Sequence, residues 1–159
     1  MAALTADVDH PHKGNLDEFK LTVKCITGDT FYKGACVYGD AATGKAQVTP
    51  YGAGDVFLGI CARQVVTTAE NDPVDIYCGG LWALPVTTPT EANVGDACFQ
   101  NASGAPTDNF ADAIFPVDEA LGANDVLIGK MIALDIEETT RAWILLRPGW
   151  IYSATLTWV

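Results

Sequence analysis

Residues 34–46 read GACVYGDAATGKA, and the interpretation of this stretch decides how the rest of the chain is predicted to fold. From Gly39 onward it has the G-x-x-x-x-G-K spacing of a phosphate-binding loop. Such a loop needs a Ser or Thr hydroxyl after the lysine to hold magnesium, and it must open a helix. Here Ala46 follows Lys45, and Pro50 comes too soon for a helix to form. The stretch therefore predicts a turn between strands rather than a nucleotide site.

A second copy of the same pattern supports this interpretation. Residues 96–107 read DACFQNASGAPT, with an Ala-Cys pair, an aromatic residue nearby and a glycine that closes the turn. Ala105 stands where the first copy has Lys45, so the recurring feature is a hairpin with a glycine at its bend. Lys45 is accordingly expected to be a solvated turn residue, and no cofactor is expected.

The strands that follow each hairpin also repeat. Two copies of strand, turn, strand, strand indicate an internally repeated unit. The matched stretches are DVFLGICA (55–62) with DVLIGKMI (125–132), which places Gly59 over Gly129, and VDIYCG (74–79) with ILLRPG (144–149).

Polar and apolar residues alternate along most of the chain, as in KLTVKCI (20–26), and this period of two is typical of strands. Helical spacing with a cap extends nowhere beyond about two turns. The predicted fold class is all-β, a compact β-barrel or sandwich built on the repeated strand-turn-strand unit. The predicted organisation is an extended N-terminal arm (1–18), a β domain (19–149) and a C-terminal aromatic strand (150–159).

Composition restricts the function classes. The 159 residues include 9 basic and 20 acidic side chains, a formal charge of −11, so nucleic acid is an unfavourable partner. No apolar run approaches the length of a membrane helix, and the first twenty residues lack the apolar core of a signal peptide. The five cysteines form no C-x-x-C pair and are expected to be reduced, small apolar residues inside strands.

The sequence contains no complete motif for catalysis or metal binding, so an enzyme is not predicted. The histidines, His10 and His12, both lie in the polar N-terminal stretch, where a metal would need a third ligand from a rigid element. A flexible arm is the preferred interpretation, so no metal site is expected. Glu137 and Glu138 are predicted to lie in a solvated turn, and no catalytic residue is assigned.

The last ten residues suggest assembly instead. Trp150, Tyr152, Leu156 and Trp158 share one face of a predicted strand that runs to the C-terminus. This strand could close the protein's own sheet, or it could pair with another subunit through its aromatic face. The second interpretation makes these four residues the candidate partner interface.

The order of several short motifs resembles that of phage head cement, or capsid decoration, proteins, in particular a small β-rich family often mislabelled as recombinase-like. The resemblance covers roughly residues 20–149. Its motifs are GACVY, DVFLGICAR, VDIYCGGLWALPV, VGDACFQNASG, DVLIGKMIAL and AWILLRPG.

This resemblance implies a structural protein of the virion. Members of the family are commonly trimeric; they bind the exterior of an icosahedral capsid after synthesis in the host cytoplasm and clamp neighbouring major capsid subunits. Neither catalysis nor a cofactor is implied. The five cysteines and the aromatic C-terminal strand depart from the usual pattern.

Two alternatives stay open at the level of sequence. Four tryptophans could provide stacking platforms for a lectin-like, carbohydrate-binding β-domain, although Trp82 and Trp143 lie in apolar strands that favour the core. A small β-enzyme acting on glycosides would need two converging carboxylates, which spacing alone cannot identify.

Overall fold

The computed structural model describes residues 6–26, 28–48, 54–100, 114–116 and 126–146. These residues form antiparallel sheets with two short 3-10 turns, η1 (Leu16–Phe19) and η2 (Glu91–Asn93). The all-β class predicted from the alternating pattern is therefore confirmed. The finer choice between a barrel and a sandwich stays a prediction.

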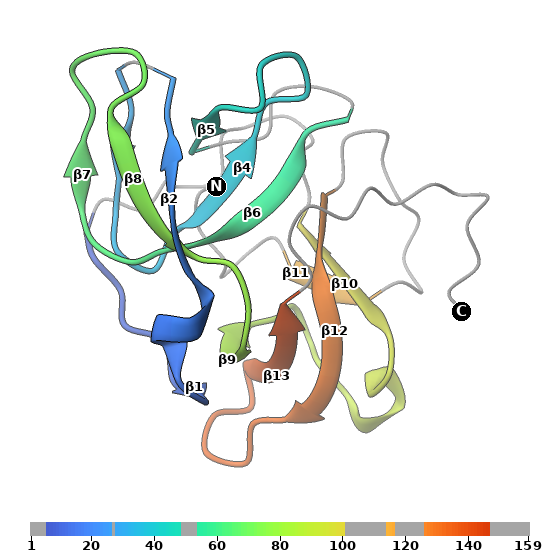
Figure 1. The fold of residues 1–159 in the computed structure, drawn as a ribbon. Coiled ribbons are helices and arrows are strands. Elements are labelled where there is room, and N and C mark those ends of the chain that lie inside the picture. The colour runs from blue at the N-terminus through green and yellow to red at the C-terminus, as the bar shows by residue number, and fades with distance from the viewer. Residues whose placement is uncertain (1–5, 27, 49–53, 101–113, 117–125, 147–159) are drawn as a thin grey trace.

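The first sheet has five strands and curls back on itself (Figure 1). Just beyond its first strand, Cys25 forms a parallel bridge with Ala46 in its last strand, so the two edges of the sheet meet. In spatial order the strands are β2 (Lys20–Lys24), β8 (Pro73–Tyr77), β6 (Val56–Cys61), β4 (Cys36–Gly39) and β5 (Ala46–Gln47).

A buried cluster lies on one face of this curled sheet. It is completed by the two-stranded sheet of β3 (Thr30–Phe31) and β7 (Val65–Val66), which contributes Phe31. Three of its seven buried members are Cys25, Cys61 and Ala46, small side chains that let closely spaced strands approach. The cysteines thus act here as the small apolar residues that the sequence predicted.

The second sheet has six strands. Its spatial order is β1 (His12–Lys13), β9 (Leu81–Pro85), β13 (Arg141–Leu146), β12 (Val126–Leu134), β10 (Ala97–Gln100) and β11 (Ile114–Pro116). Strand β13 shows the expected alternation, because Ala142, Ile144 and Leu146 are buried while the residues between them are half-buried.

The two larger sheets share the main core. Cys36, Tyr38, Phe57 and Ile60 from the first sheet pack in the same cluster as the buried residues of β9, β12 and β13. The removal of these side chains from water is the principal stabilising contribution that holds the sheets together. Figure 1 shows the curled sheet at the upper left and the second sheet at the lower right.

The predicted repeat has a counterpart in the strand order. Strands β4, β6 and β8 are neighbours in the first sheet, and β10, β12 and β13 are neighbours in the second. The pairing register shifts in each unit directly beside a glycine, Gly59 or Gly129. A β-carbon on either glycine would lie within 2.3 Å of a backbone carbonyl oxygen of the next strand. A side chain at either position would therefore force the strands apart.

The N-terminal segment differs from the free arm expected from the sequence. The Val8 amide donates to the Lys33 carbonyl (2.9 Å), and the Ala83 amide donates to the Pro11 carbonyl (2.8 Å). Strand β1 pairs with β9, with His12 opposite Trp82. Residues 7–13, called the strap below, thus connect the segment just before β4 to strand β9 of the second sheet. The division of the chain into arm, domain and terminal strand stays a prediction.

Candidate functional site

The predicted partner interface cannot be placed in this fold. Trp150, Tyr152, Leu156 and Trp158 lie outside the described residues. Their assignment to an interface between chains stays a prediction, as does the alternative in which this strand closes the protein's own sheet.

The glycine loop at residues 39–46 is a hairpin, as predicted. It connects β4 to β5, and Gly44 occupies the bend with φ of +70°, a conformation that favours glycine. The Gly44 amide donates to the Asp40 carbonyl (2.7 Å), and the Thr43 amide donates to the Asp40 carboxylate (2.8 Å). These contacts use groups that would have to face a phosphate, so the hairpin is not built as a phosphate-binding loop.

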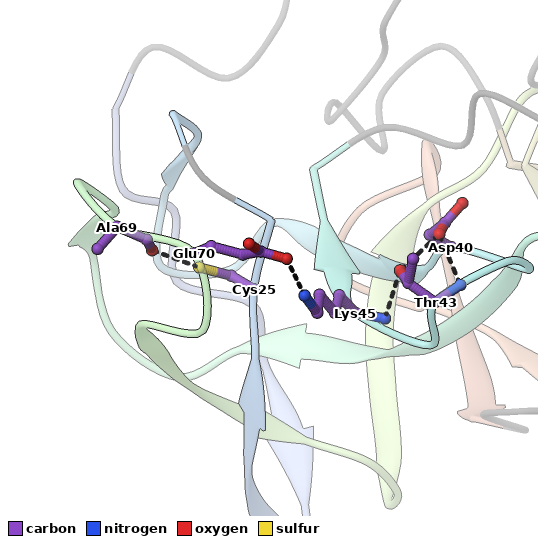
Figure 2. A network of polar contacts seen from close by, with 6 residues as sticks. All are labelled: Cys25, Asp40, Thr43, Lys45, Ala69 and Glu70. Carbon is purple, nitrogen blue, oxygen red and sulfur yellow. Dashed lines mark hydrogen bonds and ion pairs between the residues drawn. The ribbon is translucent and has the colours of Figure 1, made fainter.

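The prediction that Lys45 is merely a solvated turn residue is wrong, because its side chain is paired. Its ammonium forms an ion pair with Glu70, in the turn between β7 and β8 (Figure 2). The hydrogen bond and charge of Lys45 lower the pKa of the Glu70 carboxyl. The two residues are 25 positions apart in sequence, and their proximity follows from the curled sheet, which brings the two turns together.

A pocket of about 260 Å³ lies under the strap. The strap forms one wall through Val8, Asp9, His10 and His12. The opposite wall and floor come from the body of the protein, in particular Leu16, Ile60, Cys61, Tyr77 and Trp82.

The aromatic wall of this pocket is ordered by its own contacts. The indole N–H of Trp82 donates to the Gly79 carbonyl (2.9 Å), and the Tyr77 ring lies 5.8 Å from the Trp82 ring, centroid to centroid. On the other side, His12 approaches the Trp82 ring at 5.3 Å. The strap therefore covers an apolar, aromatic surface that would otherwise face water.

The strap fits against Gly34, the first residue of the GACVY motif, for which the sequence suggested no contact. Gly34 has φ of +84°, and a β-carbon there would lie 2.1 Å from the Val8 carbonyl oxygen. The ring Nε2 of His10 lies 3.1 Å from the Gly34 carbonyl oxygen, within hydrogen-bonding distance, and Asp9 forms an ion pair with Lys33. Any residue other than glycine at this position would displace the strap.

The titration of His10 on the strap depends mainly on burial. Desolvation lowers the pKa of His10 from its ordinary value of 6.5, so the neutral imidazole is favoured in the folded protein. Within the described parts of the chain, no three His, Cys, Asp or Glu side chains converge as a metal site would require.

The cysteines are poor candidates for chemistry. Four of the five are buried. Burial raises the pKa of the Cys61 thiol to about 11 and that of Cys98 to about 12. Both therefore stay protonated near neutral pH, whereas the thiolate is the nucleophilic form.

Two of the tryptophans considered as sugar platforms are now located. Trp82 is 4% exposed and belongs to the main core, as its apolar strand predicted. Trp143 is half-buried, and the Lys13 ammonium lies 5.0 Å from the centre of its ring.

Large apolar side chains are exposed at several positions of the described surface. The most exposed is Ile136, at 98%, in the turn between β12 and β13. The others are Phe19, Leu21, Val66, Val94 and Ile132.

The turn that carries Ile136 is held by buried polar contacts. Asp135 is 7% exposed, and it accepts hydrogen bonds from the Arg141 guanidinium (2.9 Å) and from the Glu137 amide (3.1 Å). The Arg141 amide donates to the Glu138 carbonyl (3.1 Å), and both glutamates are exposed, as predicted. Ile136 is thus presented on a well-connected turn between charged neighbours.

The chain matches no protein-family model, no curated protein and no solved structure. No helix in the described ranges is both long and apolar enough to cross a membrane.

Proposed function

We propose that the protein is a structural component of a virion: a capsid decoration, or cement, protein of an icosahedral phage head. It binds the outer surface of the head as a homotrimer and stabilises contacts between major capsid subunits. The order of the six short motifs supports the family, and the all-β body agrees with what that family implies.

The observation that carries the proposal is Ile136 on its braced turn. An isoleucine left in water forgoes about 1.5–3 kcal/mol that its burial would contribute. The Asp135–Arg141 pair and the Glu137 amide order the turn before any partner binds, which reduces the entropy lost on docking. A pre-ordered apolar contact of this kind suits a protein that binds another protein surface.

In a symmetric trimer, each contact with the capsid can be weak and the trimer can still bind the head tightly. A trimer presents three copies of the turn, and the binding of one copy raises the effective concentration of the others at neighbouring capsid subunits. The net charge of −11 would leave the outer surface of a decorated head soluble and would favour basic residues around the capsid contact.

The aromatic C-terminal strand provides the second proposed contact. Trp150, Tyr152, Leu156 and Trp158 would be buried between chains, either within the trimer or against the shell. Aromatic anchors at buried interfaces typically cost about 2 kcal/mol or more when truncated.

Co-sedimentation tests the proposal. The protein is mixed with empty shells assembled from the major capsid protein of the same genome, and the pelleted fraction is measured by gel densitometry. We expect saturable binding that Ile136→Ser weakens by about tenfold or more, which corresponds to the apolar burial estimated above.

Val66→Ser is the matched control. Val66 is 62% exposed but lies on the small β3–β7 sheet, away from the braced turn, so binding should be unchanged. Absence of wild-type protein from the pellet at every concentration would contradict the proposed function. Equal binding by wild type and Ile136→Ser would exclude the turn as the contact.

A further inference from the structure

The strap (residues 7–13) is attached to the body by a small number of polar contacts. At one end the Lys33 amide donates to the Asp7 carboxylate (2.9 Å) and the Val8 amide to the Lys33 carbonyl. At the other end Pro11 accepts from the Ala83 amide, and β1 is only two residues long. A short segment held by few contacts can open locally at a small fraction of the global unfolding free energy.

Both histidines of the chain lie in this strap, and both contact the body. His10 reaches the Gly34 carbonyl, and His12 lies against the Trp82 ring. Gly34 permits this close approach because it has no β-carbon. The geometry thus places His10 in the pocket wall, within hydrogen-bonding distance of the body.

The groups around His10 come from several elements. Desolvation disfavours the imidazolium most, the Gly34 carbonyl and Asp9 favour it, and Arg141 of β13 disfavours it. Lys33 lies beside the pocket and is paired with Asp9. The remaining titratable side chains that line the pocket are His12 on the strap, Cys61 of β6 and Tyr77 of β8.

We propose that residues 7–13 form a pH-sensitive strap, which covers the pocket while His10 is neutral and leaves the body when His10 takes up a proton. Release exposes the aromatic wall at Tyr77 and Trp82 and the edge of β9. An exposed strand edge and an apolar surface are the features that recruit a partner chain. The proposal concerns this chain alone and does not depend on the capsid function.

The direction of the pH dependence follows from burial. The seated strap keeps the pKa of His10 below 6.5, while in the released strap this pKa returns to its ordinary value. Above pH 6.5 both states hold neutral His10, so the full contribution of the seated contacts is present. As the pH falls below 6.5, the released state binds the proton first, and the seated state loses stability.

Amide hydrogen exchange of the full chain, followed by NMR, tests this directly. The reporters are the Val8 and Ala83 amides, which make one backbone contact at each end of the strap. Exchange is compared at about pH 7.5 and about pH 5.5 after correction for intrinsic rates. We expect both amides to lose protection at the lower pH while the Ile144 amide in β13 stays protected.

Three variants make the outcome decisive. His10→Gln keeps a hydrogen-bond donor but does not titrate, so its strap should stay protected at both pH values. His12→Gln should respond as the wild type does. Gly34→Ala should show the released pattern at both values, with Ile144 still protected. An unchanged wild type, an equal loss in His10→Gln, or a protected strap in Gly34→Ala would overturn the proposal.

Discussion

The β4–β6–β8 unit and the β10–β12–β13 unit each have a register shift beside a glycine. The side chains at matched positions, however, point to different faces of their sheets. In the first unit Val37 lies opposite Gly59, the register shifts, and Tyr38 then lies opposite Phe57. In the second, Cys98 lies opposite Gly129, the register shifts, and Phe99 then lies opposite Leu127. Each position in one unit thus has a counterpart in the other.

The side chains at matched positions have different surroundings. Tyr38 and Phe57 belong to the core between the sheets, whereas Phe99 and Leu127 belong to a small cluster on the other face of the second sheet. Side chains alternate between the two faces of a sheet along each strand. A shift of one residue in the position of a strand therefore moves every one of its side chains to the other face. The comparison teaches that the bulge and its glycine can recur as backbone features while the packing around them differs.

The largest expected effect comes from truncating the matched apolar pair. Phe57→Ala removes a fully buried ring from the core that joins both sheets and should cost about 3–5 kcal/mol. Leu127→Ala should cost less, about 2–3 kcal/mol, because its cluster is smaller among the described residues. Urea unfolding of both variants measures the difference, and a larger loss for Leu127→Ala would show that the cores are wrongly ranked.

The two glycines give the next comparison. Gly59→Ala and Gly129→Ala each place a β-carbon against a carbonyl oxygen of the neighbouring strand, a clash worth about 1–3 kcal/mol or more. Gly59 also has φ of +155°, so its variant should be the less stable of the two. Gly44→Ala provides the control, because its φ is positive but no atom lies within 4 Å. If this control lost as much stability as the other two, the close approach could not be the cause.

The buried ion pair of the second unit is expected to contribute less. Asp135→Ala leaves the Arg141 guanidinium and the Glu137 amide without their acceptor, at a cost of about 1–3 kcal/mol. Thermal unfolding checks the stability. Proton–nitrogen spectra should show that Ile136 becomes mobile, and an unchanged Ile136 amide signal would argue against the bracing role of Asp135.

The exposed ion pair of the first unit should matter least. Lys45→Ala removes the contact to Glu70, whose side chain is largely in water, so the melting temperature should match that of the wild type within error. ATP binding should be undetectable by titration calorimetry in either protein. ATP affinity in the wild type that disappears in Lys45→Ala would restore the phosphate-binding interpretation of the loop.

The sequence allowed the elements to be predicted better than the contacts between them. The paired glycines, Gly59 and Gly129, predicted the equivalent strands β6 and β12. The sequence aligned Cys36 with Cys98, whereas the residues that lie opposite the matched glycines are Val37 and Cys98, one position apart from that alignment. Contacts that join distant segments, such as His10 with Gly34, depend on tertiary packing and on a positive φ that the sequence did not reveal.

Electron cryo-microscopy of decorated shells tests the proposed capsid function. Shells of the major capsid protein from the same genome are imaged alone and after mixing with this protein at saturating concentration. We expect additional density on the outer surface of the mixed shells, in groups of three around the symmetry axes that relate capsid subunits. Maps of mixed and untreated shells that show the same outer surface would contradict it.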